Sequence, residues 1–71
     1  MAKRETMIPK APVARIIMNA GGKRVSQGAI DMFTQVLEEI GEEIGKKAIA
    51  LAKHTGRKTV QEEDIKLAAR Q

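Results

Sequence analysis

Two turns of this chain each carry a pair of adjacent cations, Lys23 with Arg24 and Arg57 with Lys58. Each pair lies just before the predicted N-terminus of a helix, where backbone N–H groups have no partner within the helix. Cationic side chains beside such N–H groups suit an anion, most readily a phosphate. Because the arrangement occurs twice, we favour a phosphate-bearing partner over two unrelated surface cations.

The second pair lies between two predicted helices. Gly56 ends the first of them, because glycine reaches the left-handed conformation that terminates helices without steric cost. Thr59 and Glu62 have the spacing of a capping box, in which each side chain binds the other's backbone N–H group. A helix is therefore predicted from Val60 to about Arg70. The residues that it is expected to bury are Val60, Ile65, Leu67 or Ala68, and Ala69 in part.

A short amphipathic helix is predicted over residues 12–20. Pro12 fits a first helical turn, and the apolar residues after it recur at helical spacing. Gly21 and Gly22 end this helix. Arg15 lies off its apolar side, so from the residues alone it is either a solvated cation or a DNA contact.

The longest predicted helix runs from Gln27 to about His54 and spans roughly 40 Å, with Ser26 as a favoured N-cap. Its apolar positions are Ala29, Phe33, Val36, Ile40, Ile44, Ala48, Leu51 and Ala52. One short helix at each end could not cover so wide an apolar side. A second copy is therefore expected to cover it, with the long helices crossing antiparallel so that the first turn of one protomer lies beside the second turn of its partner.

The middle of this helix is acidic, and its acids are followed by lysines at a spacing of four residues. They are Glu38, Glu39, Glu42 and Glu43, then Lys46 and Lys47. Pairs at that spacing support an exposed helix by a few tenths of a kcal/mol each. An exposed acidic surface without a catalytic role is predicted.

Charge is segregated along the chain, which has a net charge of +4 and a pI of about 9.8. Residues 1–24 carry six cations and one acid, residues 25–45 carry five acids and no cation, and residues 46–58 carry five cations and no acid. A surface that serves only solubility more often mixes its charges. The segregation therefore indicates a surface that binds a polyanion.

Other classes of function are disfavoured. Without cysteine and with a single histidine, the chain offers no disulfide, no metal site and no enzymatic nucleophile, so neither an enzyme nor a cofactor nor a small-molecule substrate is expected. No apolar run approaches the roughly 20 residues that cross a bilayer. We therefore expect no membrane partner, and we expect the protein to be cytoplasmic. Residues 1–8, which include Lys3 and Arg4, are predicted to be a short flexible arm, and residues 9–71 a single domain small enough to need oligomerisation.

Four stretches of the chain together resemble the histone fold, and closely the archaeal histones. They are Pro-Lys-Ala-Pro-Val-Ala-Arg-Ile-Ile at 9–17, Ala-Gly-Gly-Lys-Arg-Val-Ser at 20–26, Leu-Glu-Glu-Ile-Gly at 37–41, and Ala-Lys-His-Thr-Gly-Arg-Lys-Thr-Val-Gln-Glu-Glu-Asp-Ile-Lys-Leu-Ala at 52–68. The resemblance runs from Pro9 to Arg70, and the last stretch is highly specific. It implies an all-α histone fold, a short-long-short three-helix protomer that forms an intertwined antiparallel homodimer.

The resemblance also implies roles for individual residues. Arg15 matches an arginine directed at the DNA minor groove, Arg24 matches another in the first loop, and Lys58 and Thr59 match residues that contact the DNA backbone. The full set expected to bind DNA is Arg15, Lys23, Arg24, Arg57, Lys58 and Thr59.

Further matches concern the loop and the assembly. Arg57 and Asp64 resemble an arginine–aspartate pair that ties the second loop to the third helix, and Leu51, His54 and Asp64 match positions through which dimers join. Gly21 matches a small residue where successive DNA turns stack. From the residues alone, His54 would instead be expected to interact with the last carbonyl groups of its own helix.

The function implied is that of a histone that binds double-stranded DNA without sequence specificity. It would dimerise, multimerise on DNA and wrap it into nucleosome-like chromatin in the nucleoid, with a histone paralogue as a possible partner in a heterodimer. The alternative is a heterodimeric histone-fold component of a transcription-factor complex. A helix-turn-helix repressor is disfavoured by the unbroken length of the long helix.

Overall fold

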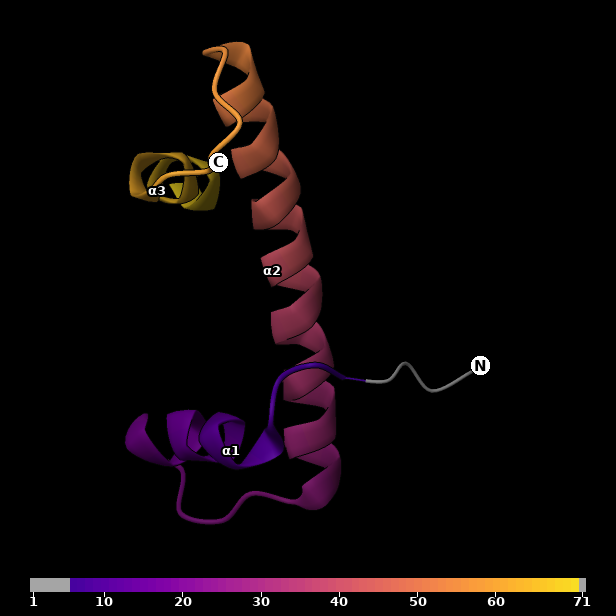
Figure 1. Ribbon diagram of the computed structural model, residues 1–71. Helices are drawn as coiled ribbons and strands as arrows, with labels where there is room; N and C mark the ends of the chain where they lie inside the picture. The colour runs from indigo at the N-terminus through magenta and orange to yellow at the C-terminus, as the bar shows by residue number, and fades with distance from the viewer. Residues whose placement is uncertain (1–5, 71) are drawn as a thin grey trace. The chain divides into compact units, whose positions relative to one another are not determined.

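The computed structural model describes residues 6–70, which contain three helices and no strand. They are α1 (Lys10–Asn19), α2 (Gln27–His54) and α3 (Glu62–Arg70), and Figure 1 shows α2 as one unbroken helix. The all-α, short-long-short prediction is therefore confirmed. The chain divides into two compact units, Met1–Glu39 and Ile40–Gln71. Lys3 and Arg4 of the predicted arm lie outside the described residues.

The C-terminus of α1 lies where the sequence predicts it. Gly21 has a φ of 113°, and the N–H group of Gly22 donates a 3.1 Å hydrogen bond to the carbonyl of Ile17 across the helix end. The N-terminus differs from the prediction, because α1 begins at Lys10. Pro12 is then the third helical residue, where an N–H group would have no acceptor within the helix, so its missing donor costs nothing there.

α2 has both predicted ends. The hydroxyl of Ser26 accepts a 3.1 Å hydrogen bond from the backbone N–H of Ala29, which confirms the N-cap. At the other end Gly56 has a φ of 74°. The backbone N–H of Arg57 donates to the carbonyl of Ala52 at 2.9 Å, which closes the helix as Gly22 closes α1.

The start predicted for α3 is wrong. The helix begins at Glu62 rather than Val60, because the carboxylate that satisfies the helix start belongs to Asp64. Its Oδ2 atom accepts a 2.8 Å hydrogen bond from the backbone N–H of Gln61. Asp64 and Gln61 have the same three-residue spacing as Thr59 and Glu62, so the sequence offers two capping positions and the later one is used.

The protomer buries few apolar side chains. The buried apolar residues among those described are Val13 in the first unit and Ala48, Ala52 and Ala68 in the second. Of the residues that the third helix is predicted to bury, Ala68 is buried, whereas Val60 and Ile65 are 39% and 44% exposed. Val36 and Ile40, on the side of the long helix that a second copy is expected to cover, are 37% and 50% exposed in the protomer. One valine and three alanines are too little apolar burial to stabilise a lone chain of this length.

Candidate nucleic-acid interface

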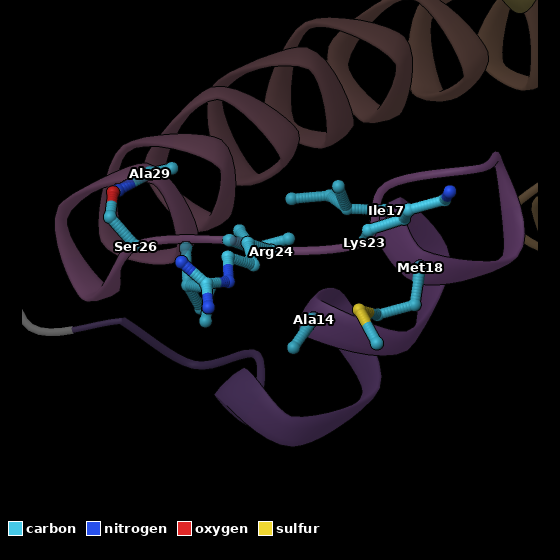
Figure 2. Close-up of a pocket in the computed structure, with 9 residues that line it drawn as sticks. Ala14, Ile17, Met18, Lys23, Arg24, Ser26 and Ala29 are labelled. Carbon is cyan, nitrogen blue, oxygen red and sulfur yellow. The ribbon is translucent and has the colours of Figure 1, made fainter.

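The first cationic pair lies on the segment between α1 and α2. Lys23 and Arg24 line the edge of an open, largely apolar pocket of about 1100 Å³, and both are exposed. Figure 2 shows their side chains leaving the segment in opposite directions. The apolar lining consists of Ala14, Ile17, Met18, Val25, Ala29 and Ile30. Both cations are therefore accessible to a large anionic partner.

The start of α2 adds to this positive surface. Its first turn contains no acidic residue, and its cap, Ser26, is neutral. The positive end of the helix dipole is therefore not neutralised by a carboxylate in its own first turn. The helix begins at Gln27, three residues after Arg24. This is the arrangement that binds phosphate at helix N-termini.

The second cationic pair has a different environment. The guanidinium of Arg57 forms a bidentate ion pair with Asp64, with Nη2 to Oδ1 at 2.8 Å and Nη1 to Oδ2 at 3.1 Å. Its remaining hydrogen bonds go to the carbonyl of Thr59 and the hydroxyl of Thr55, both at 3.1 Å. Asp64 is only 4% exposed. Arg57 is thus oriented by the protein itself, and the arginine–aspartate pair expected from the sequence does form.

This pairing shifts both pKa values. The hydrogen bond from Arg57 lowers the pKa of the Asp64 carboxyl group below its ordinary value, and the hydrogen bond from the Gln61 N–H lowers the same pKa further. The hydrogen bond to Asp64 raises the pKa of the Arg57 guanidinium above its ordinary value. Both shifts favour the charged forms, so the ion pair persists across the neutral range.

The start of α3 suits a phosphate less well than the start of α2. All three residues of its first turn are acidic, Glu62, Glu63 and Asp64. Two turns that look alike in sequence therefore differ in charge once the helix boundaries are known. On this loop Lys58 is the exposed cation without such a constraint, and it lines a pocket of about 450 Å³ with Lys53 and Arg57 over an apolar floor.

Of the other residues assigned from the sequence, three are exposed and one is half-buried. Arg15 is exposed on α1, and Gly21 is exposed at the C-terminus of α1. His54 is exposed at the end of α2, and Leu51 is half-buried one turn earlier. Lys23 and Arg24 line one pocket, and Arg57 and Lys58 line another. Asp64 is held to Arg57 by the ion pair.

One residue of the predicted acidic surface is not exposed. Glu38 is 8% exposed, and its Oε2 atom accepts hydrogen bonds from the backbone N–H groups of Met7 and Ile8, the latter at 2.8 Å. The signal for it in the sequence is its spacing from the polar residues Asp31 and Thr34, which places all three along one side of α2. Thr34 is fully buried, so this side of the helix faces the protein.

Neither a metal site nor a membrane span occurs within residues 6–70. No group of three or more histidine, aspartate or glutamate side chains in this range is arranged to hold a metal ion. No helix in the same range is long and apolar enough to cross a membrane.

Comparisons with known proteins agree on one family. Residues 6–69 match the family model described as "Histone-like transcription factor (CBF/NF-Y) and archaeal histone". The chain is 48% identical over 63 residues to a component of the archaeal histone HAN1 of Thermococcus zilligii, and 51% identical over 63 residues to probable archaeal histone 3 of Methanocaldococcus jannaschii. Each alignment covers 89% of this chain and 94% of the relative.

Proposed function

We propose that this chain, which belongs to the family of histone-like transcription factors (CBF/NF-Y) and archaeal histones, binds double-stranded DNA without sequence specificity and compacts it in the nucleoid. The observation that carries the proposal is the acid-free start of α2, preceded by the exposed pair Lys23 and Arg24. Helix dipole and side-chain charge there act together on a phosphate. Neither contact distinguishes one base from another.

The DNA-binding unit is a homodimer. Both units have exposed apolar residues that need a cover the protomer does not supply, among them Ile16 and Val36 of the first and Ile40 and Leu67 of the second. A second copy would supply it. If the two copies of α2 cross antiparallel, the first loop of each protomer approaches the second loop of its partner, and the cations of both loops face one duplex.

Within this dimer the DNA contacts have distinct roles. Arg15 reaches the minor groove, while Lys23, Arg24, Lys58 and Thr59 contact the phosphate backbone. The ion pair with Asp64 supports a bracing role for Arg57, which fixes the second loop and leaves Lys58 to neutralise phosphate. Eukaryotic histone octamers wrap DNA through minor-groove arginines and backbone contacts of this kind, and the bendability of the duplex would then set any sequence preference.

Dimers would multimerise on DNA through Leu51, His54 and Asp64, with Gly21 where successive DNA turns stack. Oδ1 of Asp64 accepts one hydrogen bond from Arg57, and a carboxylate oxygen has two lone pairs. It can therefore also accept a bond from His54 of a neighbouring dimer. A paralogue in place of one copy would use the same surfaces.

DNA affinity should fall steeply with salt concentration. Arg15, Lys23, Arg24 and Lys58 give eight cations per dimer, and six to ten phosphate contacts correspond to an affinity loss of about 10³- to 10⁵-fold between 50 and 200 mM salt. Fluorescence anisotropy with a short mixed-sequence duplex would measure this loss. An affinity that stays constant over the titration would rule out phosphate neutralisation, and a strong preference for one duplex sequence would contradict nonspecific binding.

The contact between dimers can be tested at His54. His54→Ala should leave the dimer intact in sedimentation but shorten the DNA fragments that survive micrococcal nuclease, because fewer dimers join along the duplex. Lys46→Ala, an exposed substitution elsewhere on α2, is the control and should preserve the wild-type fragments. An unaltered fragment ladder for His54→Ala would remove His54 from the interface.

The family description also includes transcription factors, and a role within such a complex is the alternative function. That function predicts a chain that neither homodimerises nor binds DNA alone. Sedimentation and the anisotropy titration therefore distinguish the two functions directly.

A further inference from the structure

The start of α1 has no cap of its own. Its N-cap residue is Pro9, no side chain caps the helix, and its first turn contains no acidic residue. α1 is also only ten residues long and includes Pro12. A helix of this length is marginal in water unless tertiary contacts hold it.

Apolar packing gives α1 little support within the protomer. Val13 is its one buried residue, while Ile16 and Met18 are 51% and 49% exposed. Ala14 and Ile17 are half-buried and add to this packing, but apolar contact is non-directional, so a few such contacts fix the angle and rotation of a helix only loosely. Directional contacts can therefore define the position of α1 against α2 more closely.

Two carboxylates of α2 supply those contacts. Asp31 forms a 2.6 Å ion pair with Lys10, the first residue of α1. Glu38 accepts the backbone N–H groups of Met7 and Ile8, just before α1. Asp31 and Glu38 are seven residues apart, about two helical turns, so they lie on one side of α2. Together they hold the segment 7–10 against that side.

We propose that Asp31 and Glu38 are positioning residues for the DNA contact of Arg15. They fix the segment from which α1 starts, and Arg15 lies five residues after Lys10, about one and a half turns along the helix. Holding the first turn therefore sets the direction in which Arg15 points. The inference rests on the proposed function, because it takes Arg15 to bind DNA.

The test compares two neutralised glutamates. Glu38→Gln and Glu39→Gln each remove one negative charge at adjacent positions, so they change the long-range attraction to DNA equally. Glu39 is exposed, whereas Glu38 holds Met7 and Ile8. A bond to a neutral amide is weaker than one to a carboxylate. The apparent affinity is reduced in proportion to the fraction of molecules in which α1 is held in the position that binds DNA. If this fraction falls to about one third in Glu38→Gln, the variant binds about threefold more weakly.

We expect Glu38→Gln to bind a short duplex about threefold more weakly than Glu39→Gln, and its Met7 and Ile8 amides to exchange faster with solvent. In an Arg15→Ala background the affinity difference should vanish, because the positioned group is gone. Equal affinities of the two glutamine variants, or a difference that persists without Arg15, would overturn this inference alone. An Arg15→Ala variant that binds like the wild type would overturn the Arg15 contact and this inference with it. Failure of the wild type to bind DNA would overturn the proposed function itself.

A charge exchange tests Asp31 independently. Asp31→Lys places a lysine next to Lys10, whereas the double variant Lys10→Glu with Asp31→Lys restores a pair of opposite charges. The single variant should therefore bind DNA more weakly than the double variant, although it carries more positive charge. Electrostatic attraction alone predicts the opposite order. Tighter binding by Asp31→Lys would therefore exclude Asp31 as a positioning residue.

Discussion

Asp64→Asn should unfold at a temperature on the order of 10 °C below the wild type when both are measured by circular dichroism at the same protein concentration. The carboxylate holds Arg57 through two hydrogen bonds and satisfies the backbone N–H of Gln61 at the start of α3. Asparagine has the same shape but carries no charge and only one acceptor oxygen, so it cannot keep all three bonds. The loss leaves the guanidinium of Arg57 without its counter-charge.

The stabilisation by Asp64 also has a defined pH dependence. Its folded-state pKa is lowered by the hydrogen bond from Arg57, so its contribution is fully present above the ordinary carboxyl pKa of 3.8 and is lost as the pH falls through the lowered pKa. Arg57 has a raised pKa, so its contribution is lost only in strong alkali. The wild type should therefore lose stability below about pH 4, and Asp64→Asn should lose less over the same interval.

The control for this prediction is Glu63→Gln. Glu63 is an exposed acid in the same helical turn, and its neutralisation should change the unfolding temperature by no more than about 2 °C. Equal unfolding temperatures for Asp64→Asn and Glu63→Gln would show that the ion pair does not hold the second loop.

Combined loss of Arg15 and Lys58 should abolish DNA compaction. Arg15→Ala with Lys58→Ala removes from a dimer four cations that displace counterions from the duplex, in the minor groove or at the phosphates. At about 0.9 of a logarithmic unit for each of them, the affinity at 0.1 M salt should fall on the order of 10³-fold. The slope of log affinity against log salt should become shallower by about three to four. The variant should remain a dimer in sedimentation, because neither side chain belongs to the exposed apolar residues that the second copy is expected to cover.

Lys46→Ala with Lys47→Ala is the matched control, since it removes the same charge from the middle of α2. It should keep compaction with a modest loss of affinity. Equal losses in the two double variants would mean that net charge, and not the placement of Arg15 and Lys58, governs binding.

Local signals in the sequence predict most of the helix boundaries. Gly21 and Gly56 end helices with positive φ values of 113° and 74°, and Ser26 caps α2. Such signals succeed because the interactions lie within four or five residues along the chain. The start of α3 is predicted wrongly because two capping positions overlap in the sequence, and the ion pair from Arg57 to Asp64, seven residues apart, favours the later one.

Contacts over longer separations could not be predicted in the same way. The bonds from Met7 and Ile8 to Glu38 join residues about thirty positions apart. The spacing of Glu38 from Asp31 and Thr34 sets it apart from Glu39, but it does not identify Met7 and Ile8 as the partners. The charge of the two helix starts differs in the same sense in the sequence, and the later start of α3 adds Asp64 to its first turn, which then has three acids while that of α2 has none.

The scarcity of buried apolar residues in the protomer, one valine and three alanines among the described residues, has a consequence for how much of the protein a cell holds. If the chain folds only as the proposed homodimer, a chain that finds no second copy would stay largely unfolded and open to proteases, since folding and pairing would share one equilibrium. While newly made chains are scarce, the number that survive as dimers would rise with the square of the number synthesised. Once the chains are abundant, nearly all of them would survive. The supply of folded protein would thus rise as a threshold in synthesis rate, without any dedicated regulator.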